Sequence, residues 1–167
     1  MRRILVILAV SGLVAGGLVT AANAHSDSRP FKGSLTGSVL FVPDENCTNN
    51  PWTMRTDSVA KGNVSHLGRT DMTSHHCTPA GTEVAGGEMT LVAANGDEVY
   101  IEYAGFAPGP DPDTGIIYVE LEYEIVGGDG RFEGAHGGGE MTVHVVFEGF
   151  EDFEWPATWS WTGTIGY

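Results

Sequence analysis

Apolar and polar residues alternate along most of the chain. Residues 116–125 show the pattern best, because Ile117, Val119 and Leu121 fall on one face and Glu120 falls on the other. Successive side chains of a β-strand point to opposite faces, so a period of two predicts strands with one buried face. Beyond the first 24 residues, no segment of the sequence keeps the period of an α-helix. The chain is therefore predicted to be all-β.

Turn-forming residues separate the alternating segments. Asn95-Gly96 is typical of a tight hairpin, because both positions of a type I′ turn need a positive φ. The run 127–130 (GGDG) marks a second tight connection, and the proline-rich run 108–113 marks a loop, since proline cannot donate to a strand ladder. These signals delimit about eight strands, near 34–42, 52–60, 63–75, 83–94, 97–106, 115–126, 131–148 with a glycine-rich break, and 157–167.

The predicted strands belong to one domain over residues 25–167, without a linker or an internal repeat. An antiparallel sandwich and an antiparallel barrel both fit the strand count. Closure is favoured because about eight strands leave an interior that side chains fill or that holds one small ligand. The sequence therefore predicts a single eight-stranded antiparallel β-barrel.

The first 24 residues have the features of a secretory signal peptide. Arg2 and Arg3 form a basic start, residues 4–20 are apolar, and Ala22-Asn23-Ala24 matches an A-x-A cleavage site. An uncleaved membrane anchor is the alternative. We expect cleavage after Ala24 and a secreted or periplasmic mature protein.

The chain is strongly acidic, with 22 Asp+Glu against 8 Lys+Arg and a formal charge of −14. Removal of the signal peptide takes away two arginines and no acid, so the mature chain is more acidic still. An acidic surface repels phosphate, which argues against nucleic acid as a partner. The acids are scattered through a chain with 41% hydrophobic residues, which is typical of a folded domain and not of an acidic tail.

The chain contains 2 cysteines, Cys47 and Cys77. In an oxidising compartment they are expected to form a disulfide, which would close a loop of about 30 residues. A metal site with the adjacent His75 and His76 is the weaker alternative, because neighbouring residues of a strand point to opposite faces. No metal site and no cofactor is predicted.

Two polar residues are candidates for the rim of a barrel, Asp97 and His66. Asp97 shares a face with Val99 and Ile101. His66 alternates with Thr70 and is equally well explained as a histidine of the barrel wall. The sequence has no G-x-S-x-G nucleophile motif, and catalytic residues stay unknown.

Residues 127–137 (GGDGRFEGAHG) resemble the G-G-T-G-x-F-x-x-A-x-G motif of the allene oxide cyclase and dirigent β-barrel superfamily. Residues 30–33, 94–97 and 163–167 look like its small secreted bacterial members, while Asp129 replaces the usual threonine. The resemblance implies an eight-stranded barrel with an apolar lumen, often a trimer. Plant relatives steer a reactive intermediate through cyclisation or coupling without a cofactor, but no catalytic residue can be carried over.

Three functional hypotheses follow. The first is an exported barrel that binds or shelters a small apolar molecule, or whose lumen is filled by its own side chains. The second is a cofactor-free cyclase or isomerase, as the resemblance implies, and the third is a small outer-membrane barrel. The predicted lumen-lining residues are Phe41, Leu91, Tyr103, Leu121, Tyr123, Val145, Phe147 and Trp161.

Overall fold

A computed structural model describes residues 28–47, 54–77, 83–149, 151 and 153–167. They form eight strands and one 3₁₀-helical turn, η1. The predicted signal peptide, residues 1–24, lies outside the described residues. The elements are β1 (Arg29–Pro43), β2 (Met54–Val64), β3 (Gly68–Cys77), β4 (Glu83–Ala93), β5 (Glu98–Phe106), β6 (Ile116–Asp129), η1 (Gly130–Phe132), β7 (His136–Val146) and β8 (Glu154–Gly166).

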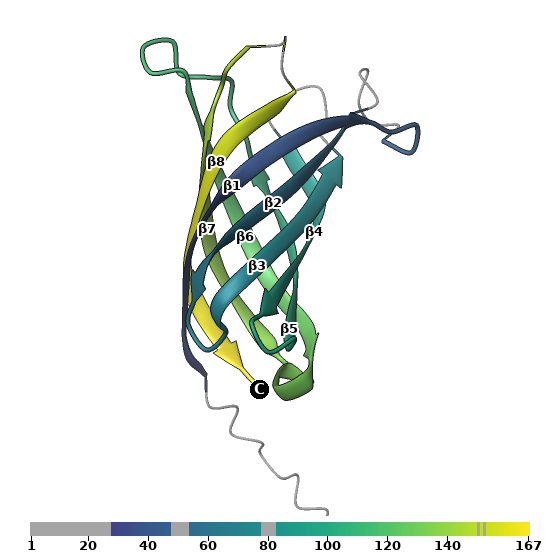
Figure 1. Ribbon diagram of the computed structural model, residues 1–167, viewed down its shortest axis with the longest axis vertical. Helices are drawn as coiled ribbons and strands as arrows, with labels where there is room; N and C mark the ends of the chain where they lie inside the picture. The colour runs from purple at the N-terminus through teal and green to yellow at the C-terminus, as the bar shows by residue number, and fades with distance from the viewer. Residues whose placement is uncertain (1–27, 48–53, 78–82, 150, 152) are drawn as a thin grey trace, which may run out of the picture.

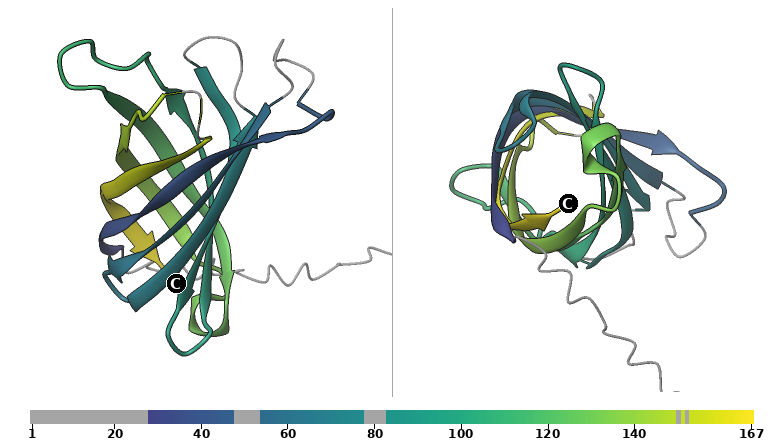
Figure 2. Two further views of the ribbon diagram at one scale, coloured as in Figure 1. Left: turned by 45° about the horizontal axis from the view of Figure 1, so that its top comes forward. Right: turned by 90° about the horizontal axis from the view of Figure 1, so that it is seen from below.

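The strands form a closed antiparallel meander (Figure 1). Each strand pairs with the next in sequence, and β1 pairs with β8 to complete the ring seen along the barrel in Figure 2. We call the end with the connections after β1, β3, β5 and β7 the loop end, and the end with η1 and the C-terminus the base. The predicted eight-stranded antiparallel barrel is confirmed. Within the described ranges, no helix has the length and apolar character that crossing a membrane requires.

Two of the predicted connections between strands are misplaced. The sequence suggests a break near residues 61–62, but β2 continues to Val64. Gly62 is not a turn residue there; it leaves room for the side chain of Leu35 on β1. The predicted strand 131–148 also begins too early, because Gly130 has φ +66° and starts η1, so that β7 begins only at His136.

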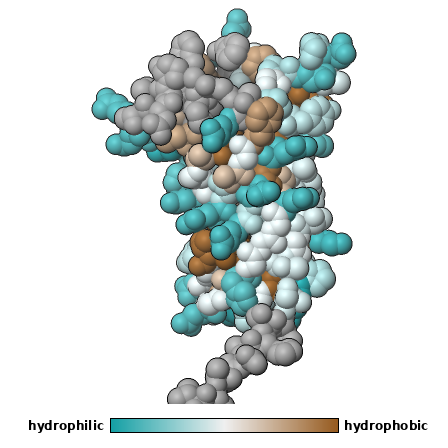
Figure 3. All heavy atoms as spheres, turned by 180° about the vertical axis from the view of Figure 1, so that it is seen from behind, coloured by the Kyte–Doolittle hydropathy of each residue, from teal (hydrophilic) through white to brown (hydrophobic). Residues whose placement is uncertain are grey.

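The predicted alternation of buried and exposed faces is confirmed on the barrel wall. On β6, Val119 and Leu121 are buried and the glutamates between and beyond them are exposed. Polar side chains cover much of the exterior, with scattered apolar ones between them (Figure 3). Most of the buried residues are apolar, and the exposed surface carries polar side chains together with several large apolar ones, among them Val59, Phe106 and Tyr118.

Large aromatic rings fill the base half of the interior by lying over glycines. Trp161 of β8 covers Gly33, its paired residue on β1, and the hydroxyl of Tyr123 reaches Gly163. Phe31 packs between them, with ring centroids 6.3 Å from Tyr123 and 6.4 Å from Trp161. A Cβ at Gly33 would overlap the Trp161 ring, and one at Gly163 would overlap the Tyr123 hydroxyl and the Gly138 carbonyl, so both glycines are needed for this packing.

Candidate functional site

A cavity of about 200 Å³ occupies the barrel interior at the loop end. All eight strands contribute side chains to it, together with Ala107 and Pro108 from the connection after β5. Met141 lines the cavity and pairs with Trp161 of the base half across β7 and β8. The cavity is therefore the region of the interior that the side chains of the loop-end half leave open.

One wall of the cavity is apolar. It is formed by four consecutive strands of the ring, β6, β7, β8 and β1, and combines branched aliphatic side chains with aromatic rings. We call it the apolar wall; its residues are Ile117, Val119, Leu121, Met141, Val143, Val145, Trp155, Trp159, Val39 and Phe41.

The facing side of the cavity carries a group of uncharged polar side chains from β2, β3 and β5. We call Thr56, Ser58, Ser74, His76 and Tyr103 the polar wall. Thr56 pairs directly with His76, and Ser58 pairs with Ser74, across β2 and β3. The threonine, the serines and the tyrosine are buried, and the histidine is partly buried. The polar wall is thus a continuous patch produced by strand register.

A hydrogen bond across β4 organises the polar wall. The hydroxyl of Tyr103 on β5 lies 2.9 Å from Nδ1 of His76 on β3, although β4 separates the two strands. The tyrosine ring crosses β4 above Gly87, its paired residue, where a Cβ would overlap the ring. Glycine at position 87 therefore makes the contact between Tyr103 and His76 possible.

Both members of this pair are neutral at neutral pH. Burial lowers the pKa of His76 to about 4; His75 adds to that effect and Asp57 opposes it. Burial also raises the pKa of Tyr103 to about 12, and the Ser74 hydroxyl acts in the opposite direction. Uncharged hydroxyl and imidazole groups, which can donate as well as accept hydrogen bonds, therefore face the cavity.

The predicted lumen-lining residues divide between the two halves of the barrel. Phe41, Tyr103, Leu121 and Val145 line the cavity. Leu91, Tyr123 and Trp161 lie in the packed core. Phe147 follows the end of β7 and packs against Trp155, with ring centroids 4.9 Å apart.

The two predicted rim residues, His66 and Asp97, lie at the base, at the opposite end from the cavity. Arg131 of η1 connects them: its Nε is 3.0 Å from Oδ2 of Asp97, and its Nη2 donates to the backbone carbonyl of His66 at 2.7 Å. His66 sits in the β2–β3 turn with φ +69°, and its ring nitrogen is 3.0 Å from the carbonyl oxygen of Pro30. In this position both residues hold the turns of the base together.

The predicted disulfide between Cys47 and Cys77 is confirmed. Cys47 follows β1, and Cys77 is the last residue of β3, directly after His76. The disulfide therefore ties the chain beyond β1 to the strand that carries the central histidine of the polar wall. It also points to an oxidising compartment.

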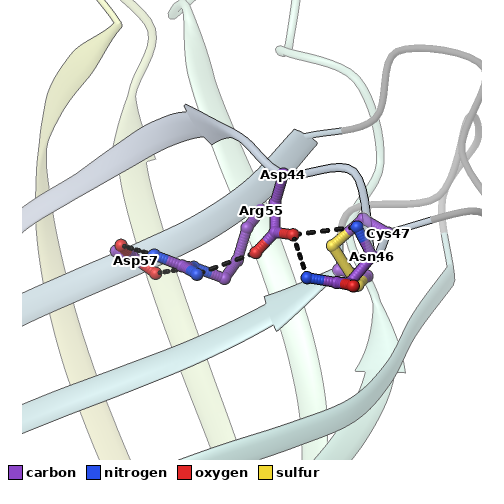
Figure 4. Close-up of a disulfide and its surroundings, with 6 residues drawn as sticks. Asp44, Asn46, Cys47, Arg55 and Asp57 are labelled. Atoms are coloured by element: carbon purple, nitrogen blue, oxygen red, sulfur yellow. Dashed lines mark hydrogen bonds and ion pairs between the residues drawn. A yellow bond between two sulfur atoms is a disulfide. The ribbon is translucent and has the colours of Figure 1, made fainter.

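Arg55 reinforces the same region (Figure 4). Its guanidinium contacts Asp57 at 2.6 Å and Asp44 at 2.8 Å, so it joins the start of β2 to the residue after β1. The hydrogen bond from Arg55 holds the pKa of Asp57 below its usual value, and the backbone N–H of Asn46 does the same for Asp44. The Arg55 and Asp57 side chains are each about a third exposed, so their ion pair stabilises the fold only modestly.

The adjacent histidines point to opposite faces, as expected for a strand. His75 is exposed, with Nε2 3.6 Å from Oε2 of Glu88, whereas His76 points into the cavity. Among the described residues, no group of three or more His, Cys, Asp or Glu side chains is arranged to hold a metal ion.

Sequence reasoning missed most of the polar wall. Residues 55–58 are polar on both faces, so local alternation does not show which side chains point inward. The apolar residues Ala60 and Val64 of β2 and Met72 of β3 could have shown which face of each strand points inward. All three are buried in the structure. Side chains two and four residues away along a strand point to the same face. Counting back from Ala60 and forward from Met72 would therefore have placed these polar side chains in the interior.

Two buried polar groups lie in the packed core below the cavity. The hydroxyl of Tyr123 and Nε1 of Trp161 have no hydrogen-bond partner within the described part of the chain. Such groups are uncommon in protein interiors. Tyr123 differs in this respect from the similarly buried Tyr103, whose hydroxyl is hydrogen-bonded to His76.

When compared with protein-family models, curated proteins and solved structures, the chain matches none of them. The resemblance to the allene oxide cyclase and dirigent superfamily therefore stays a hypothesis based on short motifs. The function has to be argued from the geometry of the cavity.

Proposed function

We propose that this protein binds one small, largely apolar molecule in the cavity at the loop end of the barrel. The observation that carries the proposal is the cavity of about 200 Å³ with an apolar wall, in a barrel whose other half is packed. Binding sites for small molecules are concave, mostly apolar and equipped with a few polar groups. This cavity has each of those properties.

The volume limits the size of the ligand. An apolar protein cavity of about 150 Å³ is large enough to bind benzene. A cavity of about 200 Å³ therefore suits a single ring with one or two small substituents. Hydrophobic burial against the apolar wall would provide most of the affinity.

Cyclisation or isomerisation is the second candidate function, because the cavity contains the hydrogen-bonded pair His76 and Tyr103. General acid–base catalysis works best when the pKa of the catalytic group lies near the working pH. The pKa values of about 4 for His76 and about 12 for Tyr103 lie far from neutrality. This mismatch favours binding over proton transfer.

The outer surface argues against the third hypothesis, an outer-membrane barrel. Glu102, Glu122 and Glu140 are exposed near the middle of their strands. Charged side chains on the lipid face of a membrane barrel are destabilising, most strongly near the middle of the bilayer. We propose instead that the barrel is exported and works in water, as the disulfide and the apolar segment before residue 25 support.

Methionine methyl NMR tests ligand binding directly. Met89 and Met141 line the cavity, whereas Met72 is buried in the core outside it. Titration of the disulfide-intact protein with p-xylene should shift the methyl signals of Met89 and Met141 and leave that of Met72 in place. A titration that moves none of the three signals would reject the proposal.

A pair of tryptophan substitutions locates the binding. Val119→Trp fills the cavity from the apolar wall, whereas Glu120→Trp places the same side chain on the exterior. We expect the first variant to lose the p-xylene response and the second to retain it, with both proteins still folded by circular dichroism. Equal binding by the two variants would place the ligand outside the cavity.

A further inference from the structure

We infer that the polar wall selects a neutral ligand with a hydroxyl group, namely a small phenol or alcohol whose hydroxyl hydrogen-bonds to the Tyr103–His76 pair. This inference rests on the proposed function and specifies the chemical class of the ligand. Three observations support it: the buried hydroxyls are concentrated at the cavity, they can both donate and accept hydrogen bonds, and the described lining residues include no cationic side chain.

The buried polar side chains are concentrated at the cavity. Among the described residues, four Ser or Thr side chains are buried, and three of them, Thr56, Ser58 and Ser74, line it. The fourth, Thr70, donates its hydroxyl to the carbonyl of Gly68 near the base. A buried hydroxyl costs free energy unless it is hydrogen-bonded, so an interior built only for stability would carry apolar side chains in the polar wall.

The atoms of the polar wall suit a hydroxyl group. Its members are hydroxyls and a neutral imidazole, and each can donate or accept according to its rotation or tautomer. Tyr103 and His76 already bond to each other at 2.9 Å, but a hydroxyl oxygen and an imidazole both keep further bonding capacity. A ligand hydroxyl, which also donates and accepts, can join such a group in either direction.

Among the described lining residues, the cavity has no cationic side chain that could balance an anionic ligand. The acidic residue among them, Glu83, is exposed. Arg55 and Asp57 of β2 point to the exterior, where they pair with each other. A carboxylate or phosphate would lose its hydration without gaining a cation, which is strongly unfavourable.

Three ligands of matched shape test the inference at neutral pH: p-xylene, p-cresol and 4-methylbenzoate. Dissociation constants come from the same methyl signals of Met89 and Met141. We expect p-cresol to bind up to about tenfold more tightly than p-xylene, as one additional hydrogen bond allows. We expect 4-methylbenzoate to bind at least about a hundredfold more weakly than p-cresol, because its charge would be buried.

Tyr103→Phe and Tyr123→Phe form a matched pair of variants. Both remove one buried hydroxyl and keep the ring, but only Tyr103 lines the cavity. Tyr103→Phe should abolish the preference for p-cresol over p-xylene, whereas Tyr123→Phe, outside the cavity, should keep that preference. The wild-type comparison stands even if one variant fails to fold.

The outcomes separate this inference from the function on which it rests. If none of the three ligands binds, the proposed function itself fails. If p-xylene binds and p-cresol gains nothing over it, the cavity is an apolar site and this inference is overturned. If Tyr103→Phe leaves the preference intact, the ligand hydroxyl does not bond to Tyr103 and the inference is overturned as well. Tight binding of 4-methylbenzoate would overturn it as well, by showing that the site accepts a charge.

Discussion

The two halves of the barrel have the same alternation of inward and outward residues but differ in how the interior is filled. In the base half, the ring of Trp161 lies over Gly33, the hydroxyl of Tyr123 reaches Gly163, and Phe31 packs against both aromatic side chains. In the loop-end half, aromatic rings such as those of Trp155 and Trp159 stand among smaller inward valines and serines, and about 200 Å³ is left open.

The comparison shows that side-chain volumes summed across the barrel decide between core and cavity. A large ring fits where a neighbouring strand presents a glycine, and the pair together fills the space at native density. Small residues on several strands at one level leave space that no side chain occupies. Both arrangements have an apolar, alternating pattern when each strand is considered alone.

The sharpest way to test this difference is to add volume to each half. Gly163→Val should lower the free energy of unfolding by about 3 kcal/mol or more, because the new side chain overlaps the Tyr123 hydroxyl and the backbone of Gly138. Ser58→Val adds a side chain beside the cavity and should change stability by about 1 kcal/mol or less.

Urea unfolding with the disulfide intact measures both effects, and Thr164→Val, exposed on the same strand, is the control. We expect the control to change stability by less than about 0.5 kcal/mol. Equal destabilisation by Gly163→Val and Ser58→Val would mean that the two halves are packed alike.

Removal of the disulfide should lower the free energy of unfolding and change the structure of the loop end first. In the chain-entropy model, a disulfide that closes about 30 residues stabilises a fold by about 3–4 kcal/mol, and Cys47 and Cys77 are 30 residues apart. The double variant Cys47→Ser/Cys77→Ser should lose that amount in urea unfolding. Its NMR spectrum should change at Met89 and Met141 and not at Met72; a shift of Met72 alone would contradict the local role of the disulfide.

Acid should destabilise the protein through the cavity before it affects the surface. The folded pKa of His76, about 4, lies below its ordinary value of 6.5, so the unfolded chain binds more protons between these pH values. The contribution of His76 to the free energy of unfolding is therefore fully present above pH 6.5. It is lost as the pH falls toward about 4, and the loss amounts to up to about 3 kcal/mol.

The variant His76→Gln provides the control for this acid effect. The charged or titratable groups near His76 are His75 beside it and Asp57 on β2, and Tyr103 faces it from β5. The pKa values of Asp57 and Asp44 lie below 3.8, so their contribution is lost only at lower pH. Urea unfolding at several pH values should show a much flatter pH dependence for His76→Gln; an unchanged slope would assign the effect to other groups.

The smallest expected difference concerns the two buried tyrosines. Tyr103→Phe should cost about 1 kcal/mol, because it breaks the bond to His76 and leaves a partly buried imidazole nitrogen without that partner. Tyr123→Phe removes a buried hydroxyl that has no hydrogen-bond partner within the described residues, so it should be neutral or stabilise the fold by up to about 1 kcal/mol. Thermal unfolding of the two variants in parallel measures the difference, and equal losses would contradict the assigned hydrogen bonding.

Sequence reasoning located the strands better than the site. Alternation is a local property, so β6 and its exposed glutamates could be predicted from consecutive residues. The polar wall could not be predicted in this way, because residues 55–58 are polar on both faces. His66 and Asp97 do lie at an end of the barrel, but at the base and not beside the cavity, in turns that Arg131 joins.

By itself, the sequence determined the all-β class, the strand number and the disulfide partners, because alternation and turn signals are local and the chain has 2 cysteines. Only the tertiary structure decided that Tyr103 crosses Gly87 to reach His76 and that the cavity opens at the loop end. These features depend on the register between strands and on the combined volume of residues far apart in the chain. Periodicity determines which way a side chain points, whereas the closed barrel determines what it meets there.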